Sequence, residues 1–148
     1  MRVFSLILLC ILSLPALQAQ KRYDKDSLLQ VFSDQTQIEY DRLNALNFLI
    51  DDFYKRDFPD SVKHYGLQML ELARTSKDIF HQGMANQFIG DGNLYLGKAE
   101  EALSYYQSAI PLFTQLKEYG QLVNLHTQMG YAWYDLNEFD SALYAYEQ

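Results

Sequence analysis

One pattern of small and aromatic residues occurs twice in this chain, forty positions apart. A glycine is followed twelve residues later by an alanine, and a tyrosine lies four residues beyond the alanine. The two sets are Gly90, Ala102 and Tyr106, and Gly130, Ala142 and Tyr146. A period of this length is typical of stacked repeats, in which each helical hairpin buries its apolar face only against its neighbours. Because no stretch alternates as a half-buried strand would, the sequence predicts an all-α solenoid of helical hairpins.

A weaker copy of the pattern precedes these two. Leu49 takes the place of its glycine and Ser61 the place of its alanine, and the interval from Leu49 to Gly90 is one position longer than the next. We expect residues 20–41 to form an N-terminal capping helix and a link. The three expected repeats are residues 42–82, 83–122 and 123–148, the last of them incomplete. Since a repeat array needs a polar capping unit at its end, we also expect the chain to continue past Gln148.

The small and aromatic positions resemble those of the tetratricopeptide repeat family, clearly in the last two repeats and less so in the first. The resemblance implies a superhelix of helical hairpins, with units of about 40 residues where the family commonly has 34. It also implies which residues pack the repeats together. These are Gly90, Gly97, Ala102, Tyr106, Ala109, Gly130, Trp133, Ala142 and Tyr146.

In that family the first helix of each pair lines a groove that holds a peptide or a partner helix. Carried over by position, the resemblance implies groove residues at Leu46, Ile50, Tyr54, Met84, Gln87, Asp91, Tyr95, Asn124, Thr127, Tyr131 and Tyr134. Tyrosine and amide side chains suit such a surface, because they combine apolar area with a polar tip. The implied function is a non-catalytic scaffold that binds a protein or peptide. For each tyrosine the alternative is that it packs between repeats.

Residues 1–19 have the pattern of a secretory signal peptide. Arg2 precedes an apolar run, and Ala19 stands at a cleavage position. The run is shorter than the ~20 apolar residues that a membrane span needs. We therefore expect export to the periplasm or the cell envelope, with removal of the single cysteine, Cys10. The alternatives are an uncleaved anchor and a lipoprotein acylated on Cys10, which the large Leu9 before it disfavours.

A narrower resemblance follows from these features. Forty-residue units behind a signal peptide, with the opening Asp26-Ser27-Leu28-Leu29, are similar to the exported N-terminal repeat regions of certain bacterial signalling proteins. In those proteins the repeats precede a membrane span and a histidine kinase or a DNA-binding regulator. The resemblance implies an alternative function, the sensory or input module of a larger membrane-bound signalling protein.

The charge of the chain argues against nucleic acid as a partner. Nineteen acidic and twelve basic residues give a net charge of −7. Removal of the signal peptide would take away Arg2 and no acid, so the difference becomes 11 − 19 = −8. A negative protein repels the phosphate backbone, and no basic cluster is longer than two residues.

Motifs for catalysis, metals or cofactors are not found in the sequence. The segment Gly90-Asp91-Gly92 is preceded by no strand and followed by no Lys-Ser/Thr pair, so it does not match a phosphate loop. It does not match a calcium loop either, because Leu96 occupies the position that requires glycine. The three histidines are scattered: His64, His81 and His126. We predict no metal, no cofactor and no enzymatic activity for these residues.

Overall fold

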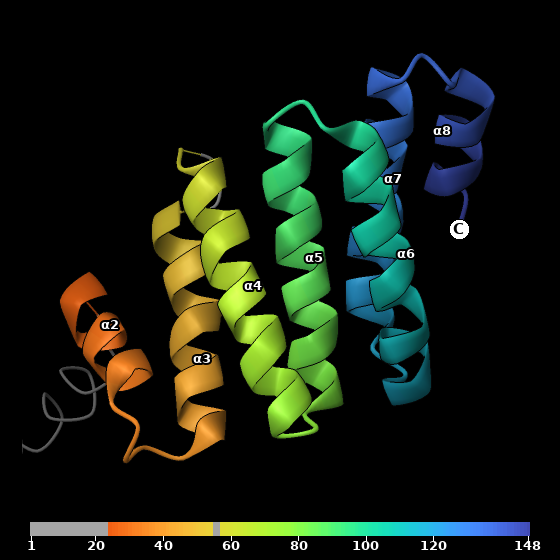
Figure 1. The fold of residues 1–148 in the computed structure, drawn as a ribbon. Helices are drawn as coiled ribbons and strands as arrows, with labels where there is room; N and C mark the ends of the chain where they lie inside the picture. The colour runs from red at the N-terminus through yellow and green to blue at the C-terminus, as the bar shows by residue number, and fades with distance from the viewer. Residues whose placement is uncertain (1–23, 55–56) are drawn as a thin grey trace, which may run out of the picture.

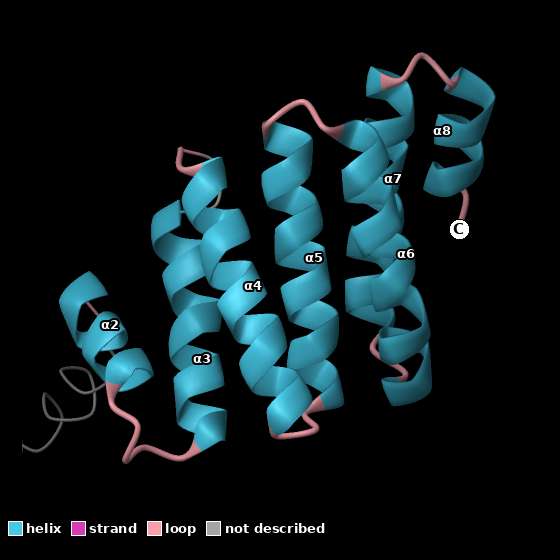
Figure 2. Ribbon diagram, in the orientation of Figure 1, coloured by secondary structure: helices cyan, strands magenta, loops and turns pink. Residues whose placement is uncertain are grey.

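The computed structural model describes residues 24–54 and 57–148, and every regular element in these ranges is a helix (Figure 2). The elements are α2 (Lys25–Ser33), α3 (Glu39–Leu49), the π-helical segment η1 (Ile50–Tyr54), α4 (Pro59–Thr75), α5 (Ile79–Tyr95), α6 (Ala99–Leu116), α7 (Tyr119–Asp135) and α8 (Phe139–Tyr146). Consecutive helices pack against each other in one row from α2 to α8 (Figure 1). The predicted all-α solenoid is confirmed. The predicted signal peptide, residues 1–19, lies outside the described residues.

A left-handed residue ends four successive helices, with the same interval between each and the next. These residues are Lys77, Gly97, Lys117 and Asn137, with φ between 59° and 72°. At each turn the next backbone N–H donates to a carbonyl five residues back, at 2.9–3.0 Å. This is the Schellman arrangement, which satisfies carbonyls that a helix end would otherwise leave unpaired. Glycine adopts this conformation most easily, but asparagine and lysine also occupy it here.

The helices also begin at a constant interval along the chain. From α3 to α8 the helices begin at Glu39, Pro59, Ile79, Ala99, Tyr119 and Phe139. The structural unit is therefore one helix with its turn, and two such units make one hairpin, which is one period of the sequence pattern. The hairpins span residues 39–75, 79–116 and 119–146, so each expected repeat boundary falls inside the first helix of a pair.

The expected alignment of the first repeat is wrong by one residue. Because corresponding helices begin forty positions apart, Ile50 and not Leu49 corresponds to Gly90, and Val62 and not Ser61 corresponds to Ala102. Burial agrees with this correction, since Val62 is completely buried and Ser61 only half-buried. The similarity of serine to alanine favours an alignment of Ser61 with Ala102, whereas the helix starts align Val62 with Ala102.

The corrected alignment shows that the first hairpin reverses the positions of a small and a large residue. Gly66 of α4 corresponds to Tyr106 of α6, while Ile50 corresponds to Gly90. The small Gly66 lets α5 approach, because a Cβ atom at this position would lie 2.9 Å from Cγ1 of Ile89. Because protein interiors are closely packed, a larger residue at position 66 would displace Ile89 of α5.

The central helix α5 is buried along almost its whole length, because α4, α6 and α7 all pack against it. Its glycines permit this crowding. A Cβ on Gly83 would lie 2.7 Å from the ring of Phe113, and one on Gly90 would collide with the ring of Tyr106. Gly130 stands in the same relation to Tyr146. Gly90 and Gly130, both predicted as packing residues, thus lie where neighbouring aromatic rings need space.

The other residues expected to pack the repeats lie at three kinds of place. Ala102, Ala109 and Ala142 are buried. Gly97 is a turn residue, and Trp133 is half-buried against the core. Tyr146, unlike its counterpart Tyr106, remains about half exposed.

Substitution of the two equivalent glycines tests this difference. We expect Gly90→Ala to lower the free energy of unfolding by about 2 kcal/mol, because the enclosed ring of Tyr106 must move. We expect Gly130→Ala to cost less, because the exposed ring of Tyr146 can swing into solvent. Urea unfolding followed by circular dichroism measures both values. Gly120→Ala is the control, since nothing lies within 4 Å of a Cβ there. Equal stability of the Gly90→Ala and Gly120→Ala variants would contradict the packing role.

Candidate protein-interaction surface

Six of the residues expected to line a groove are buried in the structure. They are Leu46, Ile50, Tyr54, Met84, Gln87 and Asp91. The expectation that these side chains face an open groove is therefore corrected. In the first hairpin the expected alignment is shifted by one residue. One residue corresponds to about 100° around a helix, so the shift selects residues of the core in place of residues on the outer side. For the middle hairpin the reason is that the neighbouring helices cover α5.

Asp91 has a structural partner in the adjacent helix. Its carboxylate accepts a hydrogen bond of 2.8 Å from the hydroxyl of Tyr106, and both side chains are buried. Burial raises the pKa of the Tyr106 hydroxyl above its usual value, and the negative charge of Asp91 raises this pKa further. The hydroxyl therefore stays protonated and keeps donating. This pair joins α5 to α6 and faces no solvent.

Removal of that hydroxyl should change both the stability of the protein at neutral pH and the dependence of stability on pH. Tyr106→Phe should lower the free energy of unfolding by about 1–3 kcal/mol at neutral pH, because a buried carboxylate loses a donor. The folded pKa of Tyr106 lies above its unfolded value near 10.0. Above that pH the unfolded chain releases the proton and the folded chain keeps it. Stability should therefore fall by up to about 1.4 kcal/mol per pH unit for this one group.

Urea unfolding at a series of pH values from 8 to 11, taken as roughly the range around the tyrosine pKa, measures the effect. The decline should be shallower in the Tyr106→Phe variant than in the unaltered chain. Tyr119→Phe is the control, since that side chain is largely exposed. Equal slopes for the unaltered chain and Tyr106→Phe would contradict the assignment.

The remaining groove candidates are accessible, and most lie on α7. Asn124, Tyr131 and Tyr134 are exposed, and Thr127 is half-buried. The hydroxyl of Thr127 donates to the carbonyl of Val123 at 2.8 Å. These residues follow one another at intervals of three or four, so they form one stripe along the helix. Tyr95, at the end of α5, is the remaining exposed candidate.

The exposed stripe of α7 continues onto α8. Tyr131 meets Tyr146 edge to face with ring centroids 6.0 Å apart, and Tyr134 meets Phe139 in the same way at 5.6 Å. Leu143 lies between the two α8 aromatic residues in the sequence and is also exposed. We call the joint surface the end face. It consists of Val123, Tyr131, Tyr134, Phe139, Leu143 and Tyr146, all exposed.

The end face is the counterpart of a surface that is buried one hairpin earlier. Leu143 is 59% exposed and Tyr134 61%, whereas their counterparts in the preceding hairpin, Leu103 and Leu94, are 5% and 9% exposed. The difference follows from the packing order, because α7 lies against α6 and α5 while α8 is the last helix of the row (Figure 1). The end face is thus a helix-stacking surface without a helix on it among the described residues.

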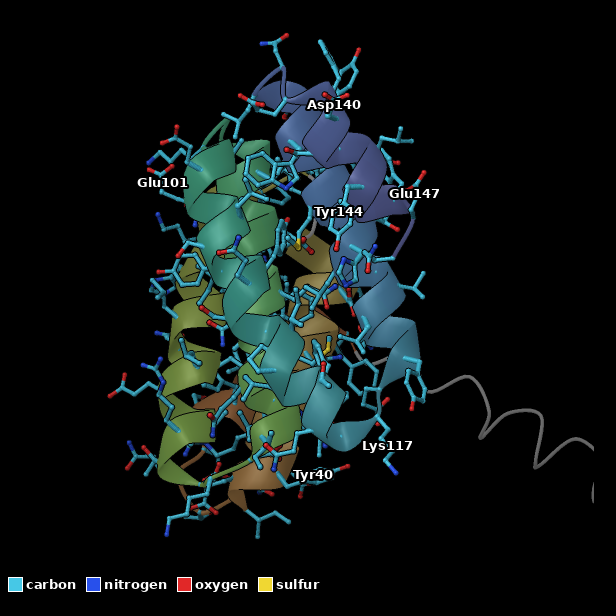
Figure 3. The ribbon with its side chains drawn as sticks, turned by 90° about the vertical axis from the view of Figure 1, so that its right-hand side faces the viewer. Tyr40, Glu101, Lys117, Asp140, Tyr144 and Glu147 are labelled. Carbon is cyan, nitrogen blue, oxygen red and sulfur yellow. The ribbon has the colours of Figure 1, made fainter. Side chains whose placement is uncertain are left out.

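A hollow of about 440 Å³ lies beside the end face, between α6, α7 and α8. Its lining residues are Gln107, His126, Met129, Trp133, Asp140, Ser141, Tyr144 and Ala145. Figure 3 views the molecule from the α8 end and shows Tyr144 beside that helix, on the side of α6. Apart from Trp133, none of these residues belongs to the expected groove residues or the expected packing residues. One signal was present, since Ala145 is smaller than Tyr105, its counterpart in the preceding hairpin.

The structure brings no metal-binding group together in the residues that it describes. Nowhere in these ranges do three or more histidine, cysteine, aspartate or glutamate side chains converge in a way that could hold a metal ion. No helix in the same ranges is long and apolar enough to cross a membrane.

Comparison with known proteins supports the fold. No protein-family model matches the sequence, and no curated protein matches it. Among solved structures, the chain is similar to the crystal structure of the TPR (tetratricopeptide repeat) domain of Arabidopsis FLU, with a TM-score of 0.67 and 18% sequence identity. The match covers 74% of this chain and 92% of that one. The fold is therefore that of a tetratricopeptide-repeat domain, as the small and aromatic residues indicated.

Proposed function

We propose that this chain is a non-catalytic repeat scaffold that binds a protein or peptide partner. The observation that carries the proposal is the end face, six large apolar side chains that lie together in solvent on two adjacent helices. Contiguous apolar surface of this kind commonly marks an interaction site. Tyrosine and phenylalanine are also enriched in protein interfaces, because a rigid ring buries much area at little cost in entropy.

The geometry favours a macromolecular partner over a small metabolite. The exposed side chains are spread along two helices, α7 and α8, and do not converge into a deep pocket. Small-molecule sites usually enclose most of their ligand. An extended apolar stripe instead fits the apolar core of an interface in a protein complex.

Substitution of two tyrosines tests the scaffold. A photo-reactive residue placed at Leu143 should form a cross-link to a partner in the producing cell. Tyr131→Ala combined with Tyr134→Ala should reduce the cross-linked species about tenfold or more, since central aromatic residues dominate binding energy. Western blotting of the cross-linked species measures the yield. Helicity by circular dichroism should stay unchanged, because both side chains are exposed.

The matched control is Tyr40→Ala, which removes an equally exposed tyrosine far along the row, on α3 (Figure 3). It should leave the cross-link yield unchanged. The scaffold proposal would be abandoned if photo-reactive residues at Leu143 and Tyr95 both failed to cross-link to any protein.

Export to the periplasm or cell envelope is a further part of the proposal, supported by the signal-peptide pattern of residues 1–19. We expect the protein in the envelope or periplasmic fraction, with a mass that lacks the signal peptide. Cell fractionation followed by intact-mass measurement checks both points. A cytoplasmic protein of full mass would contradict export.

The second candidate function is the input module of a membrane-bound signalling protein, a histidine kinase or a transcription regulator. It is supported by the narrower sequence resemblance and by an end face that is built for further stacking. The reading frame of the gene tests it. Continuation through a span of ~20 apolar residues into a kinase or regulator would support this function, and a stop codon directly after Gln148 would exclude it.

A further inference from the structure

We propose that an open furrow between α6 and α8, with Trp133 at its floor, receives an extended segment of the partner that carries lysine or arginine. This inference rests on the proposed scaffold function and adds a second contact, away from the end face, with the chemistry of the segment. Three observations carry it: a furrow that is open where its counterpart is filled, a tryptophan that lies among carboxylates, and a lysine of this chain at the counterpart of the same site.

The furrow consists of two hollows that meet at Trp133. One is the hollow of about 440 Å³ already described, and the other, also of about 440 Å³, reaches the turn between α7 and α8. Trp133 and Gln107 line both, and the walls are residues 100–107 of α6 and 138–145 around the start of α8. Tyr144, on the wall of α8, lies on the side of α6 (Figure 3). The furrow thus lies between helices of the row and shares no residue with the end face. Two adjoining hollows suit an extended segment, which can place one side chain in each.

A tyrosine stands in the two preceding hairpins where the last hairpin has Ala145. Tyr105 is half-buried against the core. Tyr65, its counterpart in the first hairpin, meets Phe32 of α2 edge to face, with ring centroids 6.4 Å apart. The residue at this position therefore points to the helix two places earlier in the row. Because the side chain of alanine ends at Cβ, Ala145 leaves the space in front of α6 open.

The packing of α6 on α7 also favours an open furrow. In the preceding hairpin, a Cβ on Gly92 of α5 would lie 2.9 Å from the carbonyl oxygen of Pro59, at the start of α4. Ala132, the counterpart of Gly92, has this Cβ and is completely buried. The start of α6 therefore cannot approach α7 as closely as α4 approaches α5, and α6 and α7 make the less extensive contact of the two pairs.

Carboxylates along the furrow determine the charge of its occupant. Glu100 and Glu138 line the hollow next to the turn, Asp140 lines the other, and all three are exposed. Among the described residues that line the two hollows, none is a lysine or an arginine. Tryptophan is the side chain whose ring attracts cations most strongly. A basic side chain at Trp133 would meet both an indole ring and complementary charge.

The chain itself supplies a cation at the counterpart of this site. Lys63 of α4 donates from its ammonium group to Oδ1 of Asn93 at 3.0 Å. Lys63 corresponds to Leu103, and Asn93 corresponds to Trp133. The last hairpin thus has an indole ring in place of the amide, and α6 has no lysine to cover it. The furrow offers to a basic side chain of the partner the position that Lys63 occupies within the chain.

The single tryptophan of the chain reports directly on the furrow. The probe is an unlabelled peptide of about eight residues, roughly 26 Å long when extended, in which lysine alternates with serine. The control peptide has glutamine in place of each lysine. Titration with the basic peptide should change the emission of Trp133 until it saturates, with an affinity about tenfold or more above that of the glutamine peptide. Isothermal titration calorimetry measures the same affinities without an optical signal.

Variants then locate the binding site. Ala145→Tyr restores the tyrosine of the preceding hairpins, fills the furrow and should weaken the basic peptide about tenfold. Glu100→Gln combined with Glu138→Gln should weaken it and reduce its dependence on salt. The matched control is Asp60→Asn combined with Glu71→Gln, two exposed carboxylates of α4, which should leave the affinity unchanged. Circular dichroism checks that each variant is folded.

Four results would overturn the proposal. These are no binding of the basic peptide by emission or calorimetry, equal binding of both peptides, unchanged binding by folded Ala145→Tyr, and self-association of the chain that Ala145→Tyr abolishes in sedimentation velocity. The last result would identify a second copy as the occupant. If Ala145→Tyr does not fold, unchanged binding by the Glu100→Gln and Glu138→Gln double variant overturns the proposal in its place.

The two proposals fail in different ways. If a cross-linked partner forms in the cell while the basic peptide fails to bind, the scaffold stands and the furrow site is wrong. If the peptide behaves as expected but no position cross-links, the scaffold role is the part that fails.

Discussion

The left-handed turn that recurs at equal intervals along the chain is the constraint on which the rest of the fold depends. At Lys77, Gly97, Lys117 and Asn137 the same backbone geometry ends one helix and starts the next. It keeps the four long helices close to the same length, 17 or 18 residues. Helices of equal length with equal turns present their side chains in the same register. That is why one position can be compared with its counterpart in the next hairpin.

Equal register concentrates burial in the middle of the row. Helix α5 has neighbours on three sides, so positions that would face a groove in an isolated hairpin are covered. Two of the polar side chains there are hydrogen-bonded to neighbouring helices. Asp91 accepts from Tyr106, and Asn93 accepts from the ammonium group of Lys63 at 3.0 Å. A buried polar group without a partner would cost about 1–3 kcal/mol. The candidate recognition surface therefore lies at the end of the row, where α7 and α8 have fewer neighbours.

The end face follows from the same rule that stabilises the interior. Each hairpin offers the next one an apolar surface, and at α7 and α8 that surface is in solvent within the described residues. Its aromatic side chains contact one another in pairs, Tyr131 with Tyr146 and Tyr134 with Phe139.

The sequence by itself determined the helical solenoid and the close contacts at Gly90 and Gly130. A glycine opposite an aromatic ring, as at Gly90 and Tyr106, is a local requirement that the order of residues displays directly. The register of the first hairpin and the location of the accessible surface were decided only by the tertiary structure. Ser61 and Val62 are neighbours in the chain, and only packing shows which one faces the core. Whether Asp91 or Tyr131 meets solvent depends on which helices cover them, and that depends on their place in the row.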